Sequence, residues 1–503
     1  MQTLFLQTIW DLKPNTWDFN PFWFSIFQLG IVGALILIGN TLRRKTPFLR
    51  NYLLPTGLIA GFLGLGLKYL FQVLKLDIGG TAIISESYMH FLTYHSLAIG
   101  FIALGLVTVE KKVEKEGRAL KSGALIVGTY LIQGLVGLVI SVIVGLIFAN
   151  MAIGKAPYAG VLLPLGFGQG PGQAGNMGGV YETLETDNAL VGGRDFGLSV
   201  AAMGFIVASI IGTIILNVVA RKGLVKRYDT EATETFGGLA ESVVDHPDEI
   251  PVVESVDKFT IQTAFVLAIY LITFGLMALV SFLVINLAGV ASLRGIIWGF
   301  NFLFAILTTM IVKAVLNLLR KKKIMKRKYI NNFMQNRIAG LAFDTMISTA
   351  IISINFGKLN DISFWILLAL MSIFGSIVTF FYIDGMAKRY FHRTRWYTFF
   401  AFFGMLTGTM SEGIALVREI DPYFETGVAE DLVNGSGTAA IFGVPMLLIT
   451  AIVYRGWVGL VVSIALCAVL FVGMTLLLHF FTKAREKKIA AEITQAEEIV
   501  ETE

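Results

Sequence analysis

The chain has 503 residues, of which 55 % are hydrophobic and 15 % are charged, and its formal net charge is +5. Soluble domains carry about 25 % charged residues, so this chain has too few charges to cover a soluble surface, and its composition also excludes a disordered, coiled-coil or collagen-like protein. The single cysteine, Cys467, excludes an internal disulfide and a metal cluster held by cysteines. The composition predicts an all-α polytopic membrane protein.

Apolar stretches that are long enough to cross a membrane follow one another along the chain. A transmembrane helix needs about 20 mainly apolar residues. On that criterion we expect spans at residues 22–42, 52–71, 88–109, 119–150, 192–220, 259–287, 294–319, 337–357, 362–386, 435–454 and 457–481.

Two further apolar stretches, residues 158–181 and 396–417, are interrupted by glycines and small polar residues. Each glycine costs about 1 kcal/mol relative to alanine inside a helix, so neither stretch is a good continuous helix. We expect each to be a re-entrant hairpin that enters and leaves the membrane on one side.

The basic residues test this topology. With the N-terminus outside and both hairpins re-entrant, most of the 40 lysines and arginines fall in inner loops, as the positive-inside rule requires. If either hairpin crossed the membrane fully, every later loop would change sides and the bias would be lost. We therefore expect a multi-pass protein of the cell (inner) membrane with an extracytoplasmic N-terminus and a cytoplasmic C-terminus.

The predicted elements divide the chain into two halves. Five spans and a hairpin precede an acidic connection, and five spans and a hairpin follow it. An offset of 238 residues aligns Gly166 and Gly170 with Gly404 and Gly408, and because five is odd, the second copy must be inverted. The expected parts are an extracytoplasmic strip (1–21), a first repeat (22–220) with hairpin 158–181, an acidic cytoplasmic linker (221–258), a second repeat (259–455) with hairpin 396–417, an extra transmembrane helix (456–482) and a cytoplasmic tail (483–503).

The first hairpin is rich in glycines and neutral amides. Glycine permits positive φ angles and a close approach of a ligand to the backbone, and amides supply donors and acceptors. The alternative is tight helix packing through small residues, which explains one or two glycines but not this density. The residues expected to bind a substrate are Gly168, Gln169, Gly170, Gly172, Gln173 and Asn176.

The second hairpin carries hydroxyl groups and a carboxylate. Thr407, Ser411 and Glu412 are hard oxygen ligands that suit Na⁺, and Thr409 and Ser411 are also expected to contact the substrate. A carboxylate at the centre of a span costs about 2.5–3.5 kcal/mol, so Glu412 is either functional, as a Na⁺ ligand, a proton carrier or a receptor for a cationic group, or paired with Arg418.

Asp344 lies inside a later span, and we expect it to be a further Na⁺ ligand or to pair with a neighbouring helix.

The sequence contains no paired carboxylates at glycosidase spacing, no Gly-x-Ser-x-Gly motif and no His-Glu-x-x-His motif. We therefore expect that the protein is not an enzyme and needs no cofactor besides a coupling ion.

Inverted repeats with broken helices near the membrane midplane are typical of secondary transporters. In this chain, three segments are similar to the bacterial sodium/glutamate symporter family. Residues 51–61 resemble the proline-containing start of its second span, and residues 166–174 and 404–415 resemble its two hairpins. The resemblance covers residues 20–455. It implies two inverted repeats of five helices plus a re-entrant hairpin each, a homodimer, and transport of L-glutamate with Na⁺.

The sequence thus predicts Na⁺-coupled symport of glutamate or a related small amino or organic acid by alternating access. Two alternatives stay open: an H⁺-coupled carrier of another solute that uses Glu412, and a gated channel or receptor with a transporter-like fold.

Overall fold

The computed structural model describes residues 21–78, 81–107, 113–184, 186–228, 258–286, 294–325, 329–422 and 424–502. Within these ranges, nine helices are long and apolar enough to span a membrane. The chain is therefore an all-α, multi-pass membrane protein. The expected strip 1–21, except for Pro21, and most of the expected linker 221–258 lie outside the described residues.

The first half of the chain is helical except for one short hairpin of strands. Ser85 caps a long helix by accepting a hydrogen bond from Tyr88 N. The elements are α2 (Pro21–Lys45), α3 (Pro47–Asn51), α4 (Thr56–Val73), β1 (Asp77–Ile78) antiparallel to β2 (Thr81–Ala82), α5 (Glu86–Leu106), α6 (Val113–Ile147), α7 (Ala152–Lys155), η1 (Pro157–Val161), η2 (Pro164–Gly168), α8 (Pro171–Glu182), α9 (Gly193–Ile206), η3 (Val207–Ile211) and α10 (Gly212–Arg221).

All regular elements in the described part of the second half are helices. Asn331 and Asp361 cap two of its helices through their side chains. The elements are α12 (Lys258–Asn286), α13 (Arg294–Gly299), α14 (Asn301–Lys321), α15 (Asn332–Ser353), η6 (Phe356–Leu359), α16 (Ile362–Tyr390), η7 (His392–Thr394), α17 (Arg395–Thr407), α18 (Met410–Arg418), α19 (Val428–Phe442), α20 (Val444–Ile452) and α21 (Gly456–Thr502).

Four expected spans differ in detail from these helices. The span at 337–357 forms α15, which is not among the nine helices that are long and apolar enough to span a membrane. The span at 294–319 is broken at Phe300 into α13 and α14. The span at 435–454 begins earlier and is bent by 53° between α19 and α20, where Pro445 removes a backbone donor from the first turn of α20. The span expected to end at residue 481 continues as α21 to Thr502, so the backbone of the expected tail prolongs the extra helix.

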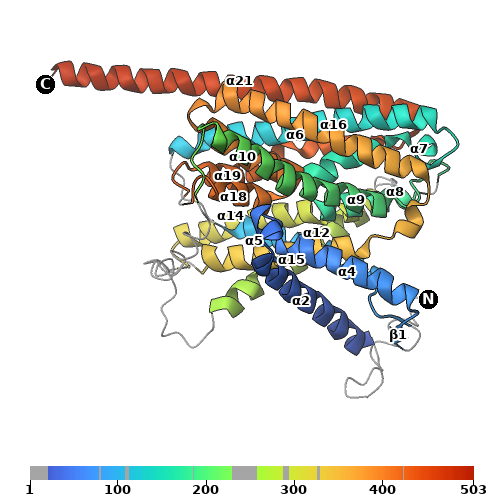
Figure 1. Ribbon diagram of the computed structural model, residues 1–503. Helices are drawn as coiled ribbons and strands as arrows, with labels where there is room; N and C mark the ends of the chain where they lie inside the picture. Colours follow the sequence, from blue (N-terminus) through green and yellow to red (C-terminus); the bar gives the residue numbers. More distant parts are fainter. Residues whose placement is uncertain are drawn as a thin grey trace.

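The helices form two layers that pack face to face (Figure 1). The layer named here after α15 contains α2, α4, α5, α12, α14 and α15, with α15 packed on both α4 and α5. The layer named after α6 contains α6 to α10 and α16 to α21, with α6 packed on α16, α19 and α21. The core of the α6 layer is aromatic, and it includes the fully buried Phe167, Phe196, Phe399, Phe400 and Phe403.

Large apolar side chains are exposed on the outer helices of both layers. Leu37, Leu271 and Val458 are 69 %, 72 % and 77 % exposed. Apolar residues gathered on outer helices of this length are the surface that a lipid bilayer covers. This agrees with the composition.

An ionic cluster joins the two layers at one end. Lys358 Nζ on η6 lies 3.3 Å from Glu86 on α5, 3.5 Å from Asp195 on α9 and 3.8 Å from Glu182 on α8. Asp195 is fully buried, and its other oxygen accepts a hydrogen bond from Asn355 N at 2.7 Å. Burial by itself would lower the pKa of Lys358, but the three carboxylates outweigh burial and raise the pKa above 10.5.

We expect Lys358→Met to lower the thermal stability of the purified protein at neutral pH, because it leaves buried Asp195 without its cation. A raised pKa in the folded state means that the lysine stabilises the fold fully below its unfolded pKa, about 10.4, and loses this effect as pH rises through the folded value. The Tm difference between wild type and variant should therefore shrink above about pH 10.4. A difference that is the same at pH 7 and pH 11 would contradict this account.

Candidate functional site

The segment 157–182, named here the first broken segment, folds back on itself. The rings of Tyr158 and Tyr181 lie 5.3 Å apart, whereas a straight helix would separate them by about 35 Å. The break falls between η2 and α8, where Gly170 has a φ of +90°. Only glycine adopts that angle readily, so Gly170 permits the turn.

Contacts with α6 show where this turn lies. Pro157 packs beside Gly145, near the C-terminal end of α6, and Gly160 packs so tightly on Gly137 that neither position has room for a Cβ. Gly168 lies against the ring of Tyr130, near the middle of α6. The first broken segment therefore runs from the C-terminal end of α6 to its middle and returns.

The segment 395–418, named the second broken segment, reaches the same place from the other end of α6. Its helices α17 and α18 fold against each other, with Gly413 packed on Ala401. Lys121, near the N-terminal end of α6, donates to Tyr390 O at 2.8 Å, just before this segment begins. Gln133, near the middle, donates from Nε2 to Leu406 O at 2.8 Å. The two breaks thus meet beside Tyr130 and Gln133.

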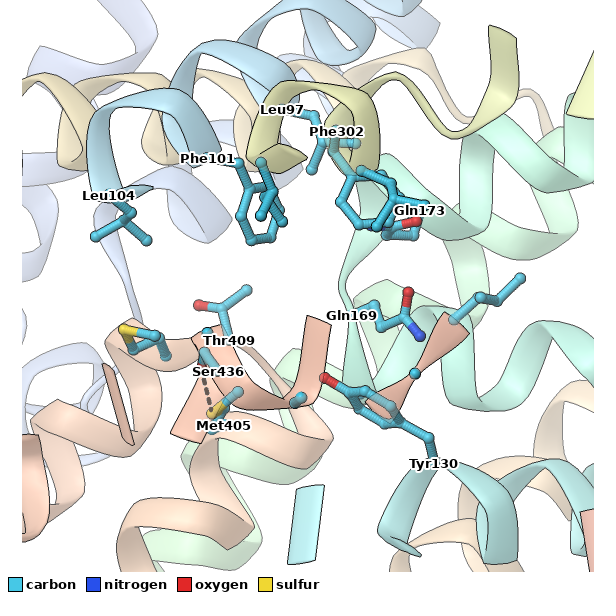
Figure 2. Close-up of a pocket in the computed structure, with 18 of the residues that line it drawn as sticks. Leu97, Phe101, Leu104, Tyr130, Gln169, Gln173, Phe302, Met405, Thr409 and Ser436 are labelled. Atoms are coloured by element: carbon cyan, nitrogen blue, oxygen red, sulfur yellow. Dashed lines mark hydrogen bonds between the residues drawn. The ribbon is translucent and has the colours of Figure 1, made fainter. Parts of the chain in front are cut away.

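A cavity of about 230 Å³ lies where the two breaks meet. It is far larger than the space that one water needs, about 10–15 Å³. Its walls come from both layers. Figure 2 shows Leu97, Phe101 and Phe302 on one side and Tyr130, Met405 and Thr409 on the other, with Gln169 between them. The cavity also receives Gly168, Gln173, Gly408 and Ser411 from the two broken segments.

Gln173 is the strongest sign of a ligand in this cavity. Its side chain is 1 % exposed, and neither its Oε1 nor its Nε2 has a hydrogen-bond partner in the structure. Buried polar atoms are nearly always hydrogen-bonded, and leaving one unpaired costs about 1–3 kcal/mol. An amide held unpaired at the wall of a cavity is therefore suited to bind a solute there.

Glu412 lies just behind the second break and caps α18. Its Oε2 accepts hydrogen bonds from Thr409 N at 2.7 Å and from Thr409 Oγ1, which forms a capping box. Glu412 is 3 % exposed, and its Oε1 has no partner. The alternative of a salt bridge with Arg418 is wrong, because Arg418 lies over the ring of Phe424, Glu412 Oε2 is bound by Thr409 and Glu412 Oε1 has no partner.

The other expected cation ligands are only partly brought together. Thr407 is fully buried and donates from Oγ1 to Phe403 O, and Ser411 is exposed at the cavity wall. Asp344 lies against Gly57 of α4 and does not line the cavity. Its role as a Na⁺ ligand stays a prediction.

Among the expected substrate ligands, Asn176 lies outside the cavity. Its Nδ2 donates to Gly299 O at 3.4 Å, and its side chain borders a separate pocket with His90 and Arg194. Gly170 and Gly172 form the turn and the start of α8, next to Thr409 and Leu97 respectively.

A second group of residues has the donor atoms for a metal ion. The ligand atoms of Glu86, His90 and Asp195 lie within 4.8 Å of one another. The ammonium group of Lys358 already lies 3.3 Å from Glu86 and 3.5 Å from Asp195. It supplies the positive charge that this group needs.

Several residues of the site were not expected from the sequence. Tyr130 and Gln133 are buried on α6, and Phe101, Phe302 and Met405 complete the apolar walls. Tyr130 and Gln133 stand in the mainly apolar part of α6, residues 124–147, and this contrast is a sequence signal for both. The sequence gives no such signal for the apolar wall residues, since any membrane helix contains residues of these types.

The comparisons with known proteins give no family for the chain. No family model matches it, and the searches of curated proteins and of solved structures find no similar protein. The geometry of the cavity and of the two breaks is therefore the basis for a proposed function.

Proposed function

We propose that the protein is a secondary active transporter that moves a small carboxylate-bearing solute, glutamate or a related amino or organic acid, together with Na⁺ by alternating access. The observation that carries the proposal is the meeting of two broken segments, one from each end of α6, at one cavity between two layers. Irregular backbone at membrane depth is tolerated where it is buried in protein or lines a wet cavity.

The proposed architecture is two inverted repeats of five helices and a re-entrant hairpin, with α21 added. Two hairpins that approach a midplane site from opposite faces give two access routes related by pseudo-symmetry. The proposal includes an extracytoplasmic N-terminus, a cytoplasmic C-terminus, the cell membrane as location and a homodimer as the assembly, all of which follow from the loop charges and from the family resemblance.

The proposed substrate ligands are the amides of Gln169 and Gln173 and the backbone N–H groups at the starts of α8 and α18. The positive end of a helix favours a carboxylate. Thr407, Ser411, Glu412 and free carbonyls at the second break are the proposed Na⁺ ligands, since Na⁺ prefers oxygen.

Uptake of labelled solute into proteoliposomes tests the proposal. Each net positive charge that moves inward across about 100 mV releases about 2.3 kcal/mol, enough for roughly 50-fold accumulation. We expect uptake to saturate, to support counterflow and to depend on an inward Na⁺ gradient. Equal uptake with Na⁺, K⁺ or no gradient would contradict the coupling, and single-channel currents would show a channel instead of a carrier.

The unpaired Oε1 of Glu412 favours one second candidate, an H⁺-coupled carrier. Glu412→Gln distinguishes the two, because glutamine keeps an oxygen for the capping box and removes the charge. For a Na⁺ ligand we expect the half-saturating Na⁺ concentration to rise at least about 10-fold, the loss of one charge-assisted contact. For a proton carrier, pH-driven uptake should be lost while exchange continues. Unchanged uptake in both assays would leave Glu412 as a helix cap only.

A further inference from the structure

The walls of the cavity are overwhelmingly apolar. The α15 layer contributes Leu97, Phe101, Phe302 and Phe343, and the α6 layer adds Met405 and Met446. Such a wall binds an apolar group by removing its surface from water, at about 25 cal/mol per Å². It offers nothing to a charged group.

The polar groups of the cavity gather at the two breaks. These are the amides of Gln169 and Gln173, the hydroxyls of Thr409 and Ser411, and the N-terminal turns of α8 and α18, with the hydroxyl of Tyr130 beside them (Figure 2). Two further hydroxyl residues of the lining, Ser436 and Thr450, lie on α19 and α20. The first N–H groups of a helix have no intrahelical acceptor. Gln173, buried and unpartnered, lines the cavity beside them. Together they form one place for one anionic group.

No second place for an anionic group exists among the described residues that line the cavity. None of them is a lysine, arginine, histidine, aspartate or glutamate. Glu412 is adjacent, but it is itself a carboxylate and an acceptor for Thr409 N, so it offers nothing to a second anionic group. A second carboxylate on the solute would lie against Phe101, Phe302 or Met405, where a charge without a partner is strongly unfavourable.

We propose that the substrate carries a single carboxylate on an apolar body, branched aliphatic or aromatic, and that dicarboxylates are excluded. This inference rests on the proposed transport function and on the same cavity, and among the carboxylate-bearing solutes proposed above it excludes glutamate itself and keeps the related monocarboxylic and amino acids. The carboxylate binds at the breaks, between the starts of α8 and α18, and the apolar body lies against the α15 layer. A carboxylic acid and the corresponding α-amino acid share this chemistry.

A panel of ligands tests the inference by thermal shift of the purified full-length protein, with counterflow in proteoliposomes as a separate measurement. The probes are phenylacetate, 4-methylpentanoate, L-phenylalanine and L-leucine on one side, and succinate and L-glutamate on the other. We expect members of the first group to raise Tm and the second group to leave it unchanged. The response to the two acids and to the two amino acids shows whether an α-amino group is needed.

The possible outcomes separate the two proposals. A Tm shift from either dicarboxylate, or from none of the six compounds, would overturn the substrate class. Counterflow of glutamate would overturn it too while leaving the transport function intact. Tm shifts from the first group without any counterflow would support the substrate class and contradict transport.

A pair of matched variants tests whether the apolar part of the solute lies against the α15 layer. Phe302→Ala should weaken the binding of phenylacetate or phenylalanine, whichever binds wild type, by about 10-fold through loss of one aromatic contact. Phe374→Ala makes the same change on α16, where the side chain is 48 % exposed on the outer surface, and should leave binding within about twofold. Equal effects of the two variants would contradict the placement.

Discussion

Replacing Gln173 by leucine is expected to weaken substrate binding strongly while making the empty protein more stable. In the empty state, the amide of Gln173 is buried without a hydrogen-bond partner, so its removal relieves a cost of about 1–3 kcal/mol. With substrate bound, the same amide is proposed to donate to a carboxylate. Hydrogen bonds to charged groups contribute about 1.5–3 kcal/mol, so the apparent affinity should fall about 10- to 100-fold.

Gln28→Leu is the matched control for this variant. Gln28 is also fully buried, but its Nε2 donates to Ile83 O at 2.8 Å and its Oε1 accepts from Ser85 N at 3.1 Å. The same substitution there should lower Tm, since it leaves a part-buried donor, Ser85 N, and acceptor, Ile83 O, without their partner, and should leave the affinity of the remaining folded protein unchanged. Thermal unfolding with and without ligand measures both effects. If Gln173→Leu destabilised the empty protein as Gln28→Leu does, Gln173 would be a structural residue.

The breaks in the chain are predictable from sequence because they depend on local chemistry. Glycines from 166 to 172 disfavour a continuous helix, and the structure indeed turns at Gly170. The span broken at Phe300 has a weaker local signal of the same kind, Gly299. Its break depends on packing, since Gly299 lies against Val180 and Met177 of the opposite layer.

The contacts of the site are less predictable than its location. Thr409 and Glu412 have the spacing of a capping box, but this pattern applies only where a helix begins, and the start of α18 depends on the break before it. Asp344 and Asn176 show the opposite difficulty. Their polarity marks them as functional, yet the direction of each side chain is set by the helix that faces it, α4 for Asp344 and α13 for Asn176.

The second large effect that we expect is at Gly204, where α9 packs closely against both broken segments. Gly204 on α9 lies directly against the carbonyl oxygen of Thr407. A Cβ added at Gly204 would also lie 3.0 Å from the ring of Phe167. Gly204 therefore contacts both broken segments at once. A Cβ at this position would overlap the Thr407 carbonyl, which is backbone and cannot rotate away.

Gly204→Ala should therefore push the second break out of place. Overpacking costs about 1–3 kcal/mol, against about 1 kcal/mol gained from the higher helix propensity of alanine. We expect a lower Tm and nearly complete loss of uptake, because the ligands at the second break shift with Thr407. A displacement of about 1 Å at a binding site can reduce its activity about 100-fold.

Gly275→Ala supplies the control, because Gly275 also lies inside a helix, α12, but has open space around it. This variant should have unchanged uptake and a Tm that is equal or higher, since only the propensity gain of about 1 kcal/mol applies. Thermal unfolding and proteoliposome uptake of both variants make the comparison. If Gly204→Ala matched Gly275→Ala in both measurements, α9 would not hold the second break in position, and the two broken segments would not form one binding site.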